Sequence, residues 1–532
     1  MYRSRDNSSR KFVSAVAVAA MAFAWNSAAL AQDANTLRYA TITEPPGLSL
    51  HEKASGATFV PLQALYEPLL RLGADMSLKP LLAESWEQIG LKTYVFKMRA
   101  GVKFHSGNPF TALDVKKSFD LHMDRNNPGF ASDYLEPVES ITVKDPLTLE
   151  IKLKRPYGPF IYALSVPHTA IGDMKKYEEV GADGLRNDPS GTGPYMLDTW
   201  SKGAELVLKS NPNYWGGKPS IDRIKFRFIP EPVARSIGLE TGEVDLVESL
   251  ASPDIARLVA NPDITVTDLY ELRSVKWLFN MRDDVLKDVA VRRAIAHAID
   301  YDLAINSVLG EAGRPMHGYV PKGSFGYTRV VYGHDPAKAT RLLEGAGWKK
   351  GSSGFFEKNG KRLTWTHVSG AHLAQEVEVA EAIQTLLREF GIDLKLEVLD
   401  RVVHTSRMWA NAKTGKTAGG TPPDFGTTQW DWGIRTVDAS ATLDPTFTCG
   451  GDRNFGHYCN PDYDKLIAAA VSGIPAKERI AKFKEAQKIL FDIVPALPLY
   501  QPRITVAYRN RVQNVRPTPT RIIYFSDLSL KR

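Results

Sequence analysis

The sequence predicts an α/β protein built from more than one lobe. Strand patterns alternate with helix patterns along the chain, and no fixed-period repeat occurs. One stretch runs from a helix through a glycine stop into a strand, which is typical of a layered α/β lobe. The chain has 532 residues, whereas one hydrophobic core rarely serves more than about 250–300 residues. We therefore expect two or three lobes.

Three segments show the pattern of strands. Residues 93–98 (TYVFKM) and 148–153 (TLEIKL) alternate apolar and polar side chains with a period of two, as half-buried strands do. Residues 394–399 (LKLEVL) follow a long helix and a glycine, and we expect a third strand there.

Helix starts and stops are also visible. Thr111 and Asp114 have the spacing of a capping box, with Asp in place of Glu, which predicts a helix start. Asp288 predicts the start of another helix. A longer helix is expected over residues 376–390 and should stop at Gly391.

The first 31 residues have the three parts of a secretory signal peptide. Four basic residues precede an apolar run over residues 12–25, and small residues stand before Gln32. About 14 apolar residues are too few to span a bilayer. No Cys follows the cleavage region, so lipid attachment there is excluded. We predict cleavage near Ala31–Gln32 and a periplasmic mature protein.

The charge of the chain argues against a nucleic-acid partner. The formal net charge is +7, and the predicted signal peptide carries four Lys/Arg and one Asp, which leaves about +4 for the mature chain. Basic residues do not gather with aromatic residues along a stripe. Such a weak field predicts no nucleic-acid binding.

The two cysteines, Cys449 and Cys459, predict a disulfide that closes a small loop in an oxidising compartment. The alternative is a metal site, because His457 lies between them. Two Cys and one His without a second cluster are poor zinc spacing. We therefore expect the disulfide, no bound metal and no cofactor.

Signatures of catalysis are missing from the sequence. Neither a G-x-S-x-G elbow nor an H-E-x-x-H motif occurs. The sequence therefore favours a protein that is not an enzyme.

Seven segments, taken in order, resemble one family of proteins. The chain is similar to the extracellular solute-binding proteins of family 5, which include dipeptide-, oligopeptide-, glutathione- and nickel-binding proteins. The segments that carry the resemblance are residues 65–69 (LYEPL), 80–86 (PLLAESW), 94–105 (YVFKMRAGVKFH), 108–115 (NPFTALDV), 191–195 (GTGPY), 211–215 (NPNYW) and 291–300 (VRRAIAHAID).

The resemblance implies a periplasmic-binding-protein-like fold of type II, cluster C, with two lobes, an inserted small domain and two hinge strands. The chain would then divide into a signal peptide (1–31), lobe I in three parts (32–66, 191–279 and 498–532), the small domain (67–190) and lobe II (280–497). The hinge crossings are expected at residues 278–281 and 497–500, both short, apolar and extended.

The family also implies a function. A ligand would lodge between the lobes, and closure would bury it. The expected protein captures a peptide or peptide-like small molecule and delivers it to the permease subunits of an ABC importer. We expect it to act as a monomer.

The segment 432–440 (WGIRTVDAS) carries the main departure from the family. Relatives commonly hold a peptide amine with an acid where this chain has Arg435. A guanidinium cannot pair with an ammonium group, but it grips a carboxylate or phosphate with two parallel hydrogen bonds. Either Arg435 faces the cleft and selects an anionic group, or it points to solvent and Asp431 or Asp438 takes the amine.

Further ligand-contacting candidates follow from the resemblance. Each has a plainer interpretation: His372 as an ordinary helix start, the segment at 190–192 as a turn, and the tryptophans as core residues. The candidates are Thr43, Glu44, Ser190, Gly191, Thr192, His372, Trp430 and Trp432.

Two other functions remain open. A carrier of nickel, of another metal chelate or of an opine-like anionic conjugate would belong to the same family. An exported hydrolase would require a nucleophile and base that the sequence does not show.

Overall fold

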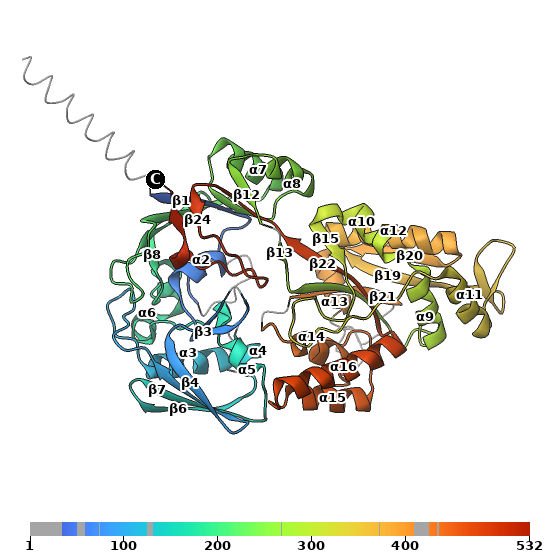
Figure 1. Cartoon of the computed structure of the whole chain (residues 1–532), viewed down its shortest axis with the longest axis horizontal. Helices are drawn as coiled ribbons and strands as arrows, with labels where there is room; N and C mark the ends of the chain where they lie inside the picture. The colour runs from blue at the N-terminus through green and yellow to red at the C-terminus, as the bar shows by residue number, and fades with distance from the viewer. Residues whose placement is uncertain are drawn as a thin grey trace, which may run out of the picture.

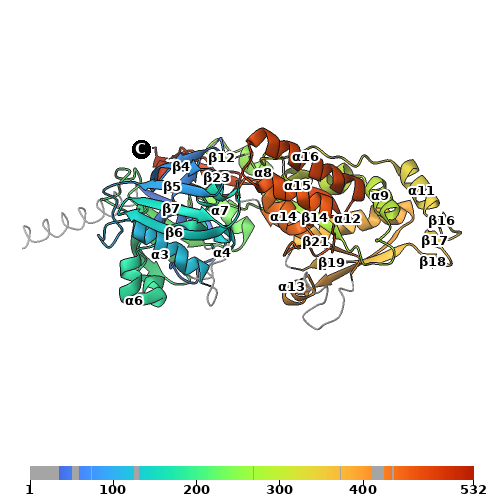
Figure 2. The same cartoon turned by 90° about the horizontal axis from the view of Figure 1, so that it is seen from below.

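The computed structural model describes residues 35–50, 59–73, 75–124, 131–267, 269–371, 373–408, 425–433 and 436–531. The predicted signal peptide and Arg435 lie outside these ranges, as does His372. Figures 1 and 2 show two lobes side by side, joined by extended strands, with a small domain attached to one of them. No helix in the described ranges is long and apolar enough to cross a membrane.

Lobe I contains a mixed seven-stranded sheet. Its strands come from distant parts of the chain, and buried apolar side chains such as Leu37, Tyr39 and Phe226 form its core. In sheet order they are β12 (Ile264–Val266), β23 (Val506–Arg509), β11 (Leu246–Glu248), β1 (Thr36–Thr41), β10 (Arg223–Phe228), β9 (Glu205–Ser210) and β8 (Tyr195–Ser201). Helices α2 (Phe59–Leu65), α7 (Pro232–Thr241) and α8 (Ser252–Val259) belong to the same lobe.

Lobe II contains a second mixed sheet with a separate core on each face. The strands in order are β13 (Leu269–Tyr270), β22 (Ala496–Ile504), β14 (Arg273–Phe279), β21 (Thr427–Gly433), β19 (Thr364–Gly370) and β20 (Asp393–Leu399), with β15 (Gly313–Pro315) on β22. Its helices are α9 (Val289–Ala298), α10 (Tyr301–Leu309), α11 (Pro336–Gly345), α12 (Ala374–Phe390), α13 (Arg401–Met408), α14 (Ser440–Phe447), α15 (Pro461–Val471) and α16 (Ala476–Ile493).

The small domain is a four-stranded antiparallel sheet with its own core. The sheet order is β4 (Ala83–Ile89), β5 (Thr93–Met98), β7 (Thr148–Leu153) and β6 (Val138–Asp145), with α3 (Ala112–Met123), α4 (Ser132–Leu135), α5 (Phe160–Ala163) and α6 (Met174–Asn187) in the same stretch of chain. It also reaches lobe II, because the N–H of Gly158 donates to the carbonyl of Val471 at 2.8 Å.

Short elements complete the fold. They are β2 (Leu70–Leu72) with β3 (Leu78–Pro80), β16 (Lys349–Lys350) with β17 (Phe356–Lys358) and β18 (Lys361–Arg362), β24 (Val512–Gln513) with β25 (Ser529–Leu530), and the 3-10 turns η2 (Pro167–Thr169), η3 (Gly310–Ala312) and η4 (Phe525–Asp527).

The elements predicted from local patterns are confirmed. The three predicted strands are β5, β7 and β20. The carboxylate of Asp114 accepts the N–H of Thr111 at 2.9 Å, and Asp288 caps α9 through the N–H of Ala290 at 2.8 Å. Helix α12 ends at Gly391, whose φ of 110° is easy only for glycine. Cys449 and Cys459 form the predicted disulfide.

The crossings between the lobes lie elsewhere than the sequence predicts. The chain passes between β12 and β13 and returns between β22 and β23, and the N–H of Thr267 donates to the carbonyl of Val506 at 2.9 Å at the two crossings. The predicted crossings at 278–281 and 497–500 fall at β14 and β22, inside the second sheet. A buried sheet strand and a buried crossing have the same short apolar pattern, so the sequence could not separate them.

Candidate functional site

The candidate site lies where the carboxyl ends of parallel strands from both lobes meet. In lobe I, β1, β10 and β11 are parallel, and in lobe II, β19, β20 and β21 are parallel. Open α/β sheets bind ligands at the carboxyl ends of their strands. A cavity of about 930 Å³, open to solvent, lies here between the lobes. Its lining includes Ser249 and Leu250 from lobe I, Arg273, Glu376, Asp431 and Tyr500 from lobe II, and Arg503, Thr505 and Arg521.

An ion pair holds the lobe II side of this cavity. Arg273, the first residue of β14, donates from Nε and Nη2 to the two carboxylate oxygens of Asp431 on β21. This paired geometry is the strongest that a guanidinium and a carboxylate form. Asp431 was predicted as a ligand residue, and it does line the cavity. Its carboxylate, however, is already occupied by Arg273.

Glu376 and Tyr500 lie beside that ion pair. Glu376 stands in the first turn of α12, and only 7% of its surface is exposed. Burial raises the pKa of Glu376 to about 7, while the positive charge of Arg273 opposes the shift. Burial also raises the pKa of Tyr500, and the neighbouring Glu376 contributes to that shift. One atom of Glu376, Oε2, has no hydrogen-bond partner.

The lobe I side is fixed by a buried arginine. Arg235 on α7 donates to the carbonyls of Ile229 at 2.7 Å, Pro230 at 2.8 Å and Glu248 at 3.1 Å, and also to that of Ser249. Ile229 and Pro230 follow β10, Glu248 ends β11, and Ser249 comes next. A single guanidinium therefore ties the chain after β10 to the end of β11, where Ser249 lines the cavity.

Asp438 does not reach the ligand cavity. Its carboxylate is 1% exposed, accepts from Arg479 on α16 at 2.6 Å and also binds Ser440 at 2.7 Å. The preceding residue, Val437, has a φ of 62°, which a β-branched residue adopts only when its surroundings impose it. Asp438, one of the two acids that the sequence offers for a ligand amine, thus pairs with a cation of the protein and does not line the cavity.

The predicted residues 190–192 are structural. The hydroxyl of Ser190 donates to Asp173 at 2.9 Å, and the hydroxyl of Thr192 donates to Glu67 at 2.9 Å. Both side chains are fully buried. A Cβ on Gly191 would lie 2.1 Å from the carbonyl oxygen of Leu65, so only glycine fits there. These residues join lobe I to the small domain and do not line the interlobe cavity.

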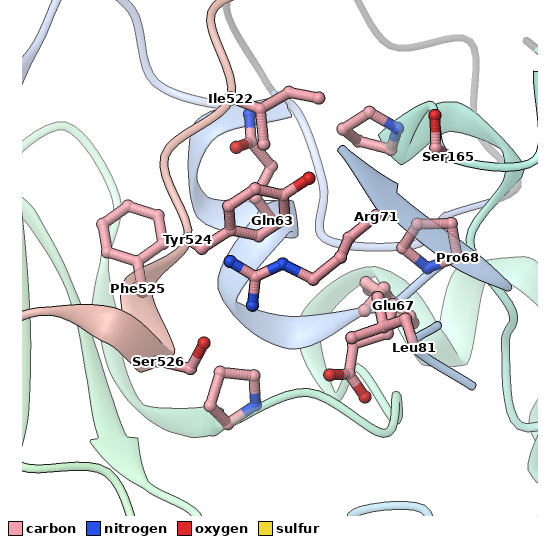
Figure 3. Close-up of a pocket in the computed structure, with 13 residues that line it drawn as sticks. Gln63, Glu67, Pro68, Arg71, Leu81, Ser165, Ile522, Tyr524, Phe525 and Ser526 are labelled. Carbon is pink, nitrogen blue, oxygen red and sulfur yellow. The ribbon is translucent and has the colours of Figure 1, made fainter. Parts of the chain in front are cut away.

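A second, narrow pocket lies near this junction (Figure 3). Burial raises the pKa of Glu67 to about 7, although hydrogen bonds from Tyr214 at 2.6 Å and Trp215 at 2.8 Å oppose the shift. The guanidinium of Arg71 lies 3.8 Å from the ring centre of Tyr524. This pocket shares no lining residue with the interlobe cavity.

The other predicted residues are placed as follows. Thr43 is exposed, and the carboxylate of Glu44 accepts from the indole N–H of Trp200 at 2.8 Å. Trp430 packs against Phe455, with ring centres 4.8 Å apart, which supports the core interpretation.

Arg435, His372 and the side chain of Trp432 lie outside the described residues. No group of three or more His, Cys, Asp or Glu in the described part of the chain is arranged to hold a metal ion.

The two lobes, the paired crossings and the cavity between them define a two-lobed solute-binding protein. Residues 77–454 match the family described as "Bacterial extracellular solute-binding proteins, family 5 Middle". The chain therefore belongs to family 5 of the bacterial extracellular solute-binding proteins, as the sequence motifs predict.

Named relatives agree with this assignment. Protein XP55 of Streptomyces lividans is 30% identical over 434 residues, which are 80% of this chain and 76% of that protein. The probable D,D-dipeptide-binding periplasmic protein DdpA of Escherichia coli is 29% identical over 444 residues, 81% of each chain. The crystal structure of NikA from Brucella suis in complex with Fe(III)-EDTA is 27% identical, with a TM-score of 0.82 over 93% of this chain and 100% of that one.

Sequence reasoning missed Arg273, Glu376, Tyr500 and Arg521. Arg273, Glu376 and Tyr500 belong to strands or a helix whose pattern is that of ordinary structure, and Arg521 lies in the irregular chain between β24 and η4. The one usable signal was the position of Glu376, six residues after the end of a strand whose carboxyl end faces the cleft.

Proposed function

We propose that this protein is the periplasmic binding component of an ABC importer and that it captures a peptide or peptide-like compound between its lobes. The observation that carries the proposal is the interlobe cavity at the carboxyl ends of both sets of parallel strands. The similarity to a D,D-dipeptide-binding protein supports the ligand class. The protein binds its ligand without turnover and passes it, as a monomer, to permease subunits.

The predicted signal peptide places the mature protein in the periplasm, with Gln32 as its first residue. Expression of the full chain in a Gram-negative host, followed by fractionation and mass measurement of the product, tests this. A mass that begins at Gln32 in the periplasmic fraction is expected. An uncleaved chain retained in the cytoplasm would contradict it.

A second candidate is a ligand with an anionic group, such as a metal chelate or an opine-like conjugate. The presence of Arg435 where relatives carry an acid favours it, as does the similarity to a structure that holds Fe(III)-EDTA. A metal would then be part of the ligand rather than a resident cofactor.

Native mass spectrometry of the purified mature protein separates these candidates. A released peptide with a free amine supports the peptide proposal. A released metal, or an anionic compound without a free amine, supports the second. For a carboxylate-bearing compound, Arg435→Ala should weaken binding by about 1.5–3 kcal/mol if the guanidinium holds that group. An unchanged affinity would place Arg435 outside the ligand site.

A further inference from the structure

The interlobe cavity contains a carboxyl group that forms no ion pair, although the charge of Arg273 lies near it. Each of the three arginines that line the cavity is paired with a different acid: Arg273 with Asp431, Arg503 with Glu311 at 2.7 Å, and Arg521 with Glu271 at 2.9 Å. Glu376 forms no ion pair in the described structure. It is nevertheless 7% exposed, and its Oε2 atom has no partner.

A buried carboxyl oxygen without a partner is costly, and a bound ligand is one partner that can satisfy it. Helix α12 has 17 residues, and the position of Glu376 in its first turn favours a negative charge there. Tyr500 stands beside it on β22, and both side chains line the cavity.

We propose that Glu376 accepts the primary ammonium group of the ligand. This inference rests on the proposed function, and it names the residue that selects for a cationic group at that site. An ammonium group supplies up to three donors and the missing charge. Glu376 would thereby provide, from α12, the acid that the sequence lacks at position 435.

A proton accompanies this binding. Burial holds the pKa of Glu376 near 7 in the empty site, so about half of the molecules carry a proton there at pH 7. Only the ionised carboxylate pairs with an ammonium group, so binding displaces that proton. For an alkyl amine, which stays charged up to pH 8, affinity should fall about tenfold between pH 8 and pH 6. For a peptide, whose α-amino group itself loses its proton near pH 8, the fall should be about fourfold.

Substitution of Glu376 keeps the other charged or titratable side chains around it in place. They are Arg273 on β14, Asp431 on β21, Tyr500 and Arg503 on β22, and Arg521 near the C-terminus. The difference between the wild-type protein and Glu376→Gln therefore isolates this one carboxyl. Glu378→Gln is the matched control, because Glu378 is exposed on the same helix.

The experiment uses full-length mature protein, freed of ligand by unfolding and refolding. Native mass spectrometry measures retention of a mixture of dipeptides, tripeptides and simple primary amines, each supplied with its N-acetylated partner, at pH 8 and pH 6. The wild-type protein and Glu378→Gln should retain free-amine members at least about tenfold better than acetylated ones. Glu376→Gln should lose both this preference and the pH dependence, with its melting temperature showing that it is folded.

The outcomes separate the two proposals. If free amines other than peptides are retained through Glu376, the peptide proposal fails and the role of Glu376 stands. If peptides are retained equally with and without a free amine, or equally by Glu376→Gln, the role of Glu376 is overturned while the peptide proposal stands. If no member is retained in a way that depends on Glu376, the role of Glu376 is also overturned.

Discussion

The buried ion pair between Asp438 and Arg479 should stabilise lobe II without touching the ligand. Both side chains are nearly fully buried, with 1% and 8% exposed. Asp438→Asn removes the negative charge and leaves the guanidinium with the carbonyl of Ala470 and the ring of Phe325, whose centre is 4.7 Å away. Removing one partner of a buried pair costs about 3–5 kcal/mol.

This cost converts to a measurable shift in melting temperature. For a lobe of roughly 200 residues, 1 kcal/mol corresponds to about 2–4 °C. Asp438→Asn should therefore lower the melting temperature of lobe II by roughly 6–20 °C in differential scanning calorimetry. Asp462→Asn, which breaks an exposed pair with Lys465 on the same lobe, should change it by no more than about 2 °C.

The double variant Asp438→Asn/Arg479→Met distinguishes a buried pair from general disruption. It removes the unpaired cation, so it should recover most of the stability that the single variant loses. Unchanged stability of Asp438→Asn together with a large loss of ligand affinity would refute the reasoning, since that result is expected only if Asp438 contacts the ligand.

Three further changes test other parts of the structure. Reduction of Cys449–Cys459, whose loop spans 10 residues, should cost about 2–3 kcal/mol in the chain-entropy model; an unchanged melting temperature with dithiothreitol would contradict this. Burial lowers the pKa of Lys276 from 10.5 to about 7, so the native state binds fewer protons than the unfolded chain between these values and stability should rise with pH there. Lys276→Met should remove that rise and be more stable than wild type at pH 6–7, by roughly 3–5 kcal/mol. Urea unfolding of both proteins at pH 6, 8 and 10 tests this. An equal change of unfolding free energy with pH in the two proteins would contradict it. Gly191→Ala forces a Cβ against a backbone carbonyl and should cost at least about 3 kcal/mol, whereas Gly450→Ala, with open space around it, should cost less than about 1 kcal/mol; equal melting temperatures would remove the steric argument.

Local chemistry made part of the fold predictable. The start of α3 depends on Thr111 and Asp114, three residues apart, and the end of α12 depends on Gly391 alone. The disulfide needs only two cysteines in an oxidising compartment. Each of these features is complete within a short window, so the sequence contains all the information that it requires.

The site was harder to predict because its partners are distant in the chain. The carboxylate of Glu44 accepts a hydrogen bond from Trp200, and that of Asp438 accepts one from Arg479, at separations of 156 and 41 residues. The hydroxyl of Thr192 likewise donates a hydrogen bond to Glu67, 125 residues away. A polar residue in a loop has the same local pattern whether it awaits a ligand or already has a partner in the fold. Only the folded chain separates these two cases.

The arrangement of contacts explains how such a cleft opens and closes. Within lobe I, Arg235 binds the carbonyls of Ile229 and Ser249, and within lobe II, Arg479 binds Asp438. Polar contacts between the small domain and lobe II in the described part of the chain include the bond from Gly158 to Val471, a hydrogen bond between Tyr157 and Ser440, and an ion pair of 3.3 Å between Arg453 and Asp133, whose side chain is 76% exposed. An exposed pair contributes at most about 1 kcal/mol. Tyr157 and Tyr162 of the small domain also pack against the apolar cluster of lobe II. A ligand that contacts both lobes can shift the equilibrium between open and closed forms toward closure.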